Sequence, residues 1–174
     1  MLNIFMENLE ACPVILYHGS NMVADRPEIR KPSRPLDFGE GFYTTFSREQ
    51  ACRWSSKVFE RRNDGSPILN IYEYDRFEAA EKLKIRTFEK PDAEWLRFVI
   101  SNRTSDFFHD FDIVEGPVAN DTMYSVLIGF ENGIFSLDEA ISRLKPESLT
   151  DQVLFHTPAS LEYLKFTGFE EVSP

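Results

Sequence analysis

Two short stretches of this chain of 174 residues place ligand-binding side chains next to glycines that expose backbone. Residues 16–20 read LYHGS, and residues 38–45 read FGEGFYTT. Glycine in or beside a strand often marks a bulge or a point where another group approaches the backbone. Exposed amides can bind a carboxamide, the Tyr43 phenol can stack on a ring, and the His18 imidazole can bind a ribose hydroxyl. The two stretches therefore suit a flat, polar, aromatic ligand.

These stretches form one site only if the strands that carry them lie together. In that case we expect His18 and Tyr43 to face a common cleft whose floor is the backbone of Gly19, Gly39 and Gly41. The chain has no P-loop, no G-x-S-x-G motif and no His-x-x-x-His pair, the local signatures of common nucleotide-binding proteins and hydrolases. A Cys-His or Ser-His-Asp site stays open, because such groups meet in space rather than in sequence.

Hydrophobic spacing predicts the elements that position these residues. Apolar or alternating runs predict strands at 14–17, 41–46, 68–74, 111–118 and 153–156. Helix starts are predicted at the capping boxes of residues 47–50 and 136–139, at Pro91 and at Pro158, and the spacing from Met123 to Phe130 predicts a further helix. Because strands and helices are mixed without regular βαβ alternation, we expect a single α+β domain over residues 1–174, with residues 1–12 as an N-terminal extension.

Composition narrows the class of protein. The chain carries 19 Lys+Arg against 29 Asp+Glu, a formal net charge of −10, which disfavours general binding to nucleic acid or anionic membranes. Cys12 and Cys52 match no metal spacing and indicate a reducing compartment. The sequence shows no signal peptide and no apolar run long enough to span a bilayer. We therefore expect a soluble, cytoplasmic protein with no metal site and no membrane contact.

Several other conspicuous residues have simpler structural interpretations. Trp54 and Trp95 fall at helical spacing among apolar neighbours and are expected in the core. His109 and His156 are expected to be structural. The basic run at residues 26–34 favours a solvated loop over a pyrophosphate clamp.

Five segments along the chain together resemble a known family. They are LYHGS, DFGEGFYTT, a following QA…W helix, DIVEGPVANDTMY, and DQVLFHT leading into LEYLKF. In this order they resemble an uncharacterised bacterial family of the ADP-ribosyltransferase superfamily, in its His-Tyr-Glu branch. The resemblance runs from about Val14 to Phe166.

The resemblance implies an ADP-ribosyltransferase-like split β-sandwich around an NAD cleft, flanked by helices. His18 would hold the nicotinamide-side ribose, Gly19 would bind the carboxamide and Tyr43 would stack on the nicotinamide ring. The third catalytic residue of the branch, commonly glutamate, corresponds to Gln152, which keeps only hydrogen bonding. The residues implied to contact NAD, the co-substrate, are His18, Gly19, Ser20, Phe38, Gly39, Gly41, Phe42, Tyr43 and Thr44.

The implied activity is transfer of ADP-ribose from NAD to a protein or nucleic-acid acceptor. Such an enzyme could be the toxin of a bacterial toxin–antitoxin pair, with an antitoxin protein as partner. Because glutamine stands where glutamate is usual, a catalytically weak module that binds NAD or ADP-ribose is an alternative. An NAD glycohydrolase, with water as acceptor on the same site, is another. Acceptor choice depends on the conformation of the loops around the cleft, which cannot be predicted from this sequence alone.

Overall fold

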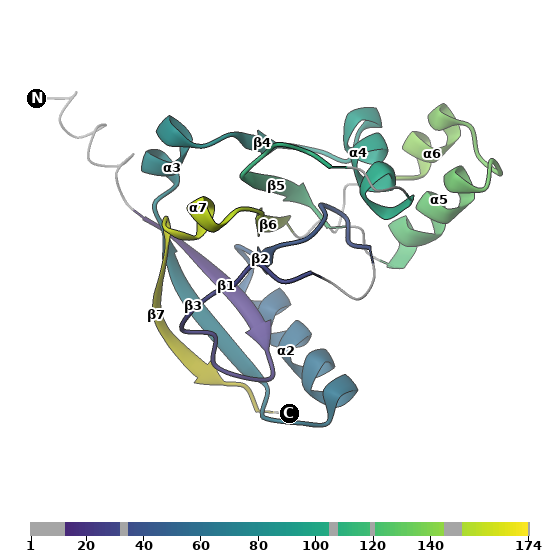
Figure 1. Ribbon diagram of the computed structural model, residues 1–174. Helices are drawn as coiled ribbons and strands as arrows, with labels where there is room; N and C mark the ends of the chain where they lie inside the picture. The colour runs from purple at the N-terminus through teal and green to yellow at the C-terminus, as the bar shows by residue number, and fades with distance from the viewer. Residues whose placement is uncertain (1–12, 32–34, 105–107, 119–120, 145–150, 174) are drawn as a thin grey trace, which may run out of the picture.

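The computed structural model describes residues 13–31, 35–104, 108–118, 121–144 and 151–173. Within these ranges the chain forms two β-sheets and six helices (Figure 1). The mixture of largely antiparallel strands with helices confirms the predicted α+β class. The expected N-terminal extension, residues 1–12, lies outside the described residues.

The two sheets differ in size and strand order. The smaller sheet is antiparallel, in the order β1-β3-β7. Its strands are β1 (Val14–Ser20), β3 (Ile68–Tyr74) and β7 (Leu164–Glu171). The larger sheet has the order β2-β6-β5-β4, in which β4 and β5 are parallel and the other neighbours antiparallel. Its strands are β2 (Phe42–Thr44), β4 (Ile85–Thr87), β5 (Ile113–Pro117) and β6 (Asp151–Phe155). The short strand β2 therefore lies at an edge.

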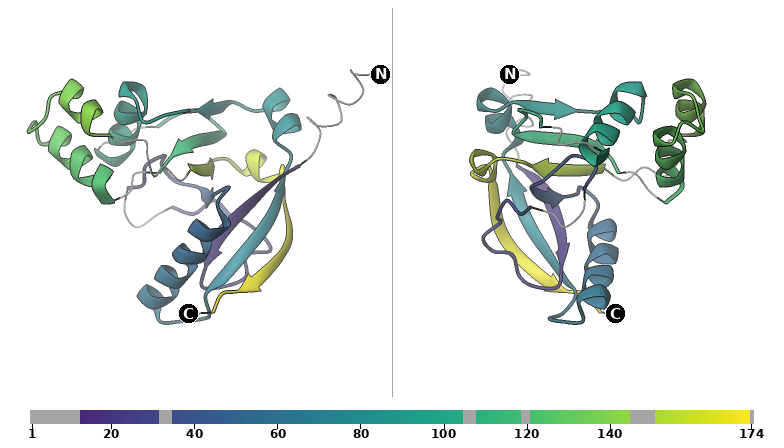
Figure 2. Two further views of the ribbon diagram at one scale, coloured as in Figure 1. Left: turned by 180° about the vertical axis from the view of Figure 1, so that it is seen from behind. Right: turned by 45° about the vertical axis from the view of Figure 1, so that its right-hand side comes forward.

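The helices divide between the two sheets. Helix α2 (Arg48–Arg62) packs on β1 of the smaller sheet. Three helices gather beside the larger sheet: α4 (Ala93–Thr104), α5 (Asp121–Glu131) and α6 (Leu137–Arg143). The remaining two helices, α3 (Arg76–Lys82) and α7 (Pro158–Leu161), follow β3 and β6. Both views of Figure 2 show α2 running along the smaller sheet, with α5 and α6 at one end of the larger sheet.

Apolar clusters cover both faces of the larger sheet. Along β6, Val153 and Phe155 belong to a cluster shared with Tyr72 of the smaller sheet. The intervening Leu154 belongs to a second cluster, which includes Trp95 of α4. This alternation follows the two-residue period of a strand. The larger sheet is thus the middle layer, between the smaller sheet and the helices α4 to α6.

The predicted elements are present, most of them with shifted bounds, and three others were missed. All five predicted strands and all five predicted helices occur, whereas α3, β4 and β7 were not predicted. The capping box at Ser136 has both of its bonds. At the start of α2, Ser47 caps the Gln50 N–H as expected, but the Gln50 side chain accepts from Thr45 instead of reaching back.

One predicted core tryptophan lies at the surface. Trp95 is fully buried, whereas the Trp54 residue is 44% exposed. The buried face of α2 is formed by Ala51, Ser55 and Val58. Small residues are needed there, because α2 approaches β1 so closely that a single added carbon on β1 would clash with the helix backbone. A tryptophan at helical spacing was therefore a correct sign of a helix but a wrong sign of burial.

The two sheets are joined at the edges of β1 and β2. Tyr17 and Thr45 exchange two backbone hydrogen bonds of 2.9 Å in an isolated antiparallel bridge. The strands that carry the two conspicuous sequence stretches thus meet at one point instead of pairing along their length. This contact places His18 beside the strand that carries Tyr43.

Candidate functional site

A pocket of about 1030 Å³ lies where the two sheets meet. This volume is slightly above the usual range for small-molecule sites, about 300–1,000 Å³. The lining comes from β1, β2, the segment at residues 22–30, the face of α2 and part of α5. His18, Tyr43 and Gln152, the three predicted catalytic residues, all border it. Residues on three strands of two sheets are therefore brought to one pocket.

His18 lies at the junction of the sheets with a defined protonation state. Its Nδ1 is 2.7 Å from the Tyr43 carbonyl oxygen, and its ring centroid is 4.5 Å from that of Phe42. Since a carbonyl oxygen only accepts, Nδ1 carries the proton and Nε2 of the neutral ring keeps a lone pair. Burial lowers the pKa of His18 to about 4, and the charges of Arg30 and Arg62 act in the same direction. The imidazole is therefore neutral at pH 7 and offers one acceptor nitrogen.

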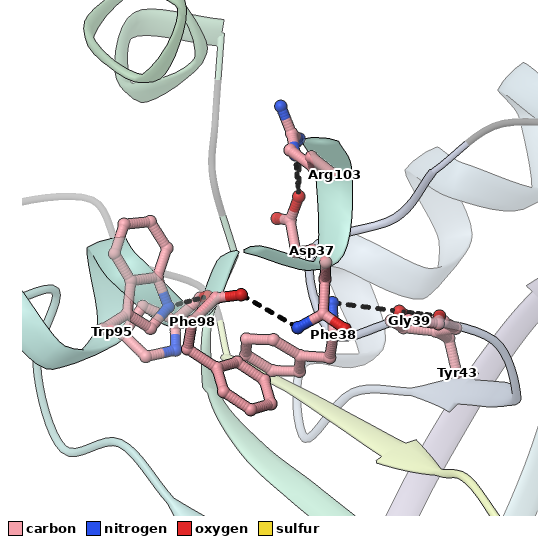
Figure 3. Close-up of polar contacts among 9 residues, drawn as sticks. Asp37, Phe38, Gly39, Tyr43, Trp95, Phe98 and Arg103 are labelled. Atoms are coloured by element: carbon pink, nitrogen blue, oxygen red, sulfur yellow. Dashed lines mark hydrogen bonds and ion pairs between the residues drawn. The ribbon is translucent and has the colours of Figure 1, made fainter. Parts of the chain in front are cut away.

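Tyr43 is anchored through its hydroxyl. The hydroxyl donates to the Gly39 carbonyl oxygen at 2.6 Å and accepts from the Phe38 N–H at 3.3 Å (Figure 3). Burial raises the pKa of Tyr43 far above its ordinary value, and the negative charge of Asp37 adds to this effect. The phenol therefore stays protonated. Its ring is fixed by the strand at one end and by the turn before the strand at the other.

The turn that receives the Tyr43 hydroxyl is itself tied to α4 by an ion pair. Arg103 donates to Asp37 Oδ1 from Nε at 2.8 Å and from Nη2 at 2.5 Å (Figure 3). The side chains of Arg103 and Asp37 are only 18% and 9% exposed. The Arg103 guanidinium also lies 4.9 Å from the centroid of the Tyr124 ring on α5. The loop at one side of the pocket is thus joined to two helices.

The glycines of the two stretches make room for the protein's own chain. A Cβ at Gly19 would lie 2.1 Å from the Ala51 carbonyl oxygen, and one at Gly41 would lie 2.3 Å from that of Phe155. Gly39 and Gly41 also have φ angles of 93° and 146°, which other residues rarely adopt. The sequence led us to expect a ligand at these positions, but the chain contacts account for glycine without one. Gly19 and Gly41 line the pocket, whereas Gly39 is not among the described residues that do so.

The other predicted contacts are divided between the pocket and the core. Ser20, Phe42 and Thr44 line the pocket. The Thr44 hydroxyl is already used, because it donates to the Val153 carbonyl oxygen at 3.1 Å. Phe38 is fully buried in the cluster on the helix side of the larger sheet and does not line the pocket within the described ranges.

Gln152 combines burial with an unused hydrogen-bonding atom. It is the second residue of β6, opposite Gly116 of β5, and is 9% exposed. Its Nε2 is buried and has no hydrogen-bond partner within the described part of the chain. Buried polar atoms are normally satisfied. An unsatisfied amide on a residue that borders the pocket is a candidate for contact with a bound molecule.

Sequence reasoning missed the aromatic walls of the pocket. Trp54 on α2 and Tyr124 on α5 line it with exposed fractions of 44% and 49%. Each carries an arginine over its ring, with Arg61 5.9 Å from the Trp54 centroid and Arg103 over Tyr124. Their spacing in the sequence is that of helix residues, so it carries no sign that the rings face a pocket.

The lining of the pocket is rich in arginine although the chain carries a net charge of −10. Five arginines and four carboxylates line it: Arg26, Arg30, Arg61, Arg62 and Arg103, with Asp25, Glu28, Asp37 and Glu131. Arg30 pairs with Glu28 and Arg103 with Asp37, and Arg62 donates to the Asn21 side-chain oxygen. Among the described residues no carboxylate forms an ion pair with Arg26, Arg61 or Arg62. Arg26 and Arg30 are exposed, as predicted for a solvated loop, and they also line the pocket; Arg34 lies outside the described residues.

Two further features were looked for in the described ranges. No three His, Cys, Asp or Glu side chains come together there as possible metal ligands. No helix there has the length and apolar character needed to cross a bilayer.

Comparison with known families places the chain in one of them. A family model described as "Protein of unknown function (DUF3990)" matches residues 14–166, and the chain belongs to this family. The match covers both sequence stretches, the helix α2 and the strand that carries Gln152. No curated protein matches the chain.

Proposed function

We propose that this protein is an NAD-dependent ADP-ribosyltransferase that transfers ADP-ribose to a protein or nucleic-acid acceptor. The observation that carries the proposal is the meeting of His18, Tyr43 and Gln152 at one pocket. These residues lie far apart in the sequence, on three different strands. Two packed sheets around this pocket are compatible with an ADP-ribosyltransferase-like split β-sandwich, which we propose as the finer description of the fold.

The protonation states favour the proposed ligand. Neutral His18 offers Nε2 as an acceptor for a ribose hydroxyl, because Nδ1 is occupied by the Tyr43 carbonyl. A neutral imidazole also avoids repulsion with the positively charged nicotinamide ring of NAD. Tyr43 supplies a protonated, anchored phenol whose ring can stack on an aromatic ligand.

The charges around the pocket favour a ligand that carries phosphate. Arg61 and Arg62 lie together at the end of α2, and Arg26 and Arg30 lie on the facing loop. Arginine binds phosphate oxygens through its planar set of donors. In a chain with a net charge of −10, such a local group is unlike the rest of the composition. A dinucleotide with a central pyrophosphate matches these charges better than a neutral ligand does.

The proposed chemistry needs little from the side chains. The bond between the ribose C1′ and the nicotinamide nitrogen breaks, and its electron pair leaves with neutral nicotinamide. A nucleophile of the acceptor then bonds to C1′ and loses its proton. Gln152 can hydrogen-bond the substrate but cannot offset positive charge on the ribose as a carboxylate would. We therefore expect slow transfer. We include in this proposal that the enzyme acts as a toxin whose partner is an antitoxin protein.

Incubation of the purified protein with NAD labelled in the adenylate moiety tests the proposal. Label that becomes attached to a macromolecule supports transfer, and digestion with protease or nuclease identifies the acceptor class. Release of nicotinamide without transfer indicates an NAD glycohydrolase. Binding measured by calorimetry without turnover indicates a binding module. Absence of binding to both NAD and ADP-ribose contradicts all three functions.

A further inference from the structure

Two histidines form a stacked pair behind the turn that holds Tyr43. The ring centroids of His109 and His156 lie 4.4 Å apart, with the planes tilted by 41°. His109 lies shortly before β5 and is 6% exposed, and His156 directly follows β6. The pair therefore packs at the ends of two central strands of the larger sheet.

Both imidazoles bind backbone carbonyls of the same turn. His109 Nε2 is 2.9 Å from the Phe38 carbonyl oxygen, and His156 Nδ1 is 2.7 Å from the Glu40 carbonyl oxygen. A carbonyl oxygen only accepts, so each of these nitrogens carries a proton. The two bonds hold the turn on either side of Gly39.

The carbonyl between these two anchor points is the one that receives the Tyr43 hydroxyl. Gly39 has a φ of 93°, and glycine changes its backbone conformation more freely than any other residue. No side chain of its own fixes the direction of its carbonyl. That direction is set largely by the peptide groups on either side, which His109 and His156 hold.

We propose that His109 and His156 are positioning residues for Tyr43: their hydrogen bonds to the Phe38 and Glu40 carbonyls fix the turn at residues 38–40, whose Gly39 carbonyl receives the Tyr43 hydroxyl. This proposal rests on the proposed function only for the role of Tyr43 in binding NAD. The orientation of the Tyr43 ring is a property of the free protein. It can therefore be tested without a ligand.

Aromatic rings hold the buried member of the pair in place. Phe98 and Phe111 pack against the His109 ring with centroids 5.2 and 5.7 Å away. The neighbouring carboxylates in the chain are engaged elsewhere: Asp110 with Lys84, and Asp112 with the Thr157 hydroxyl and the Lys84 N–H.

The protonation state of the buried ring agrees with this geometry. Burial lowers the pKa of His109, and the neighbouring His156 lowers it further, although the backbone bonds to Phe38 and Phe111 and the charge of Asp110 act in the opposite direction. A neutral ring carries one proton, which lies on the Nε2 that faces the Phe38 carbonyl oxygen.

Paired substitutions test whether these hydrogen bonds position Tyr43. His109→Gln and His156→Asn place an amide N–H near the positions of Nε2 and Nδ1. His109→Leu and His156→Leu remove the donors at similar volume. Each protein is labelled with fluorotyrosine, and the Tyr43 signal is assigned with a Tyr43→Phe variant. ¹⁹F NMR at neutral pH then compares the surroundings of the Tyr43 ring in these proteins.

We expect the Tyr43 signal of the Gln/Asn double variant to match that of the unsubstituted protein, and the signal of the Leu variants to be displaced. Because the effect acts through Tyr43, the Leu variants should bind NAD up to about fivefold more weakly than the Gln/Asn variant, a loss of about 1 kcal/mol. Folded Leu variants with an unchanged signal, or a Gln/Asn variant with a displaced one, would overturn the proposal. If one Leu variant unfolds, the other Leu variant and the Gln/Asn variant decide. If NAD does not bind, the proposed function fails while the Tyr43 signal still tests the positioning role.

Discussion

The Nδ1 atom of His18 lies 2.7 Å from the carbonyl oxygen of Tyr43, so a side chain of the smaller sheet holds the edge strand of the larger one. The bond lies next to the backbone bridge between Tyr17 and Thr45, and the two together join β1 to β2. Because Nδ1 is used in this bond, Nε2 is the imidazole nitrogen that is left for another partner. The same contact therefore belongs to the fold and to the proposed ligand site.

Stability should fall when the protein is acidified through the range in which His18 would titrate in an unfolded chain. The pKa of His18 is lowered from 6.5 to about 4, so between these values the unfolded state binds a proton that the folded state does not. The free energy of unfolding is therefore unaffected by protonation of His18 above pH 6.5. It falls as the pH drops toward 4, by about 3 kcal/mol in total. Urea unfolding at a series of pH values measures this loss.

His18→Asn is the matched variant for this measurement. Asparagine can still donate an N–H to the Tyr43 carbonyl but does not titrate. The variant should therefore lose less stability in acid than the unsubstituted protein. An equal dependence on pH in both proteins would show that His18 is not its source.

Gly19→Ala should destabilise the protein by about 2–3 kcal/mol, the usual cost of overpacking. The added Cβ would lie 2.1 Å from the Ala51 carbonyl oxygen, so β1 and α2 would have to separate. Gly168→Ala on β7 is the control, because a Cβ there meets nothing within 4 Å. Thermal and urea unfolding of both variants give the comparison. Equal stabilities would mean that the contact between β1 and α2 is looser than described.

Arg103→Met should cost about 3 kcal/mol, because it leaves the largely buried Asp37 carboxylate without its cation. Arg53→Met removes an exposed pair with Glu49 on α2 and should cost less than about 0.5 kcal/mol. The free energy of unfolding of the two variants tests this difference. If Arg103→Met is as mild as Arg53→Met, the ion pair does not hold the turn at residues 36–39.

The sequence could predict those elements whose hydrophobic spacing or capping residues match the side chains that are buried in the structure. β3 runs from Ile68 to Tyr74 as predicted, and Ser136 begins a helix with a complete capping box. β7 was missed because its alternation of apolar and polar residues is short: it runs from Leu164 to Thr167 and breaks at Gly168, where the pairing with β3 shifts register. The short α3 and β4 offer few buried residues for a pattern to reveal.

The candidate site divides in the same way. His18, Tyr43 and Gln152 were identifiable by residue type and by the resemblance of their motifs, and they border one pocket. The reason for the glycines was not identifiable, since a sequence does not say whether a ligand or the chain itself approaches the backbone. Trp54 likewise reads as core until the close approach of β1 to α2 is known. The need for glycine and the exposure of Trp54 both depend on contacts between segments far apart in the sequence.

Tyr43→Ala should weaken NAD binding more than any other single substitution in the pocket. It removes the ring proposed to stack on nicotinamide, a contact worth about 1 kcal/mol, or roughly fivefold in affinity. Phe77→Ala is a suitable control, because this aromatic residue of α3 is 54% exposed and is not among the described residues that line the pocket. Calorimetry with NAD compares the two. Undiminished affinity in a folded Tyr43→Ala protein would contradict the stacking role.

Gln152→Glu should raise turnover if transfer is limited by the missing carboxylate. The residue is 9% exposed, and burial raises the pKa of a carboxyl group, so the gain should grow as the pH rises and the new side chain ionises. Gln152→Met, of similar size but unable to donate or accept a strong hydrogen bond, is the control and should not gain activity. Nicotinamide release and label transfer are measured in parallel across neutral and alkaline pH. If the Glu variant keeps NAD cleavage but loses transfer, Gln152 instead selects the acceptor; if both activities fall, the carboxylate is not what limits this site.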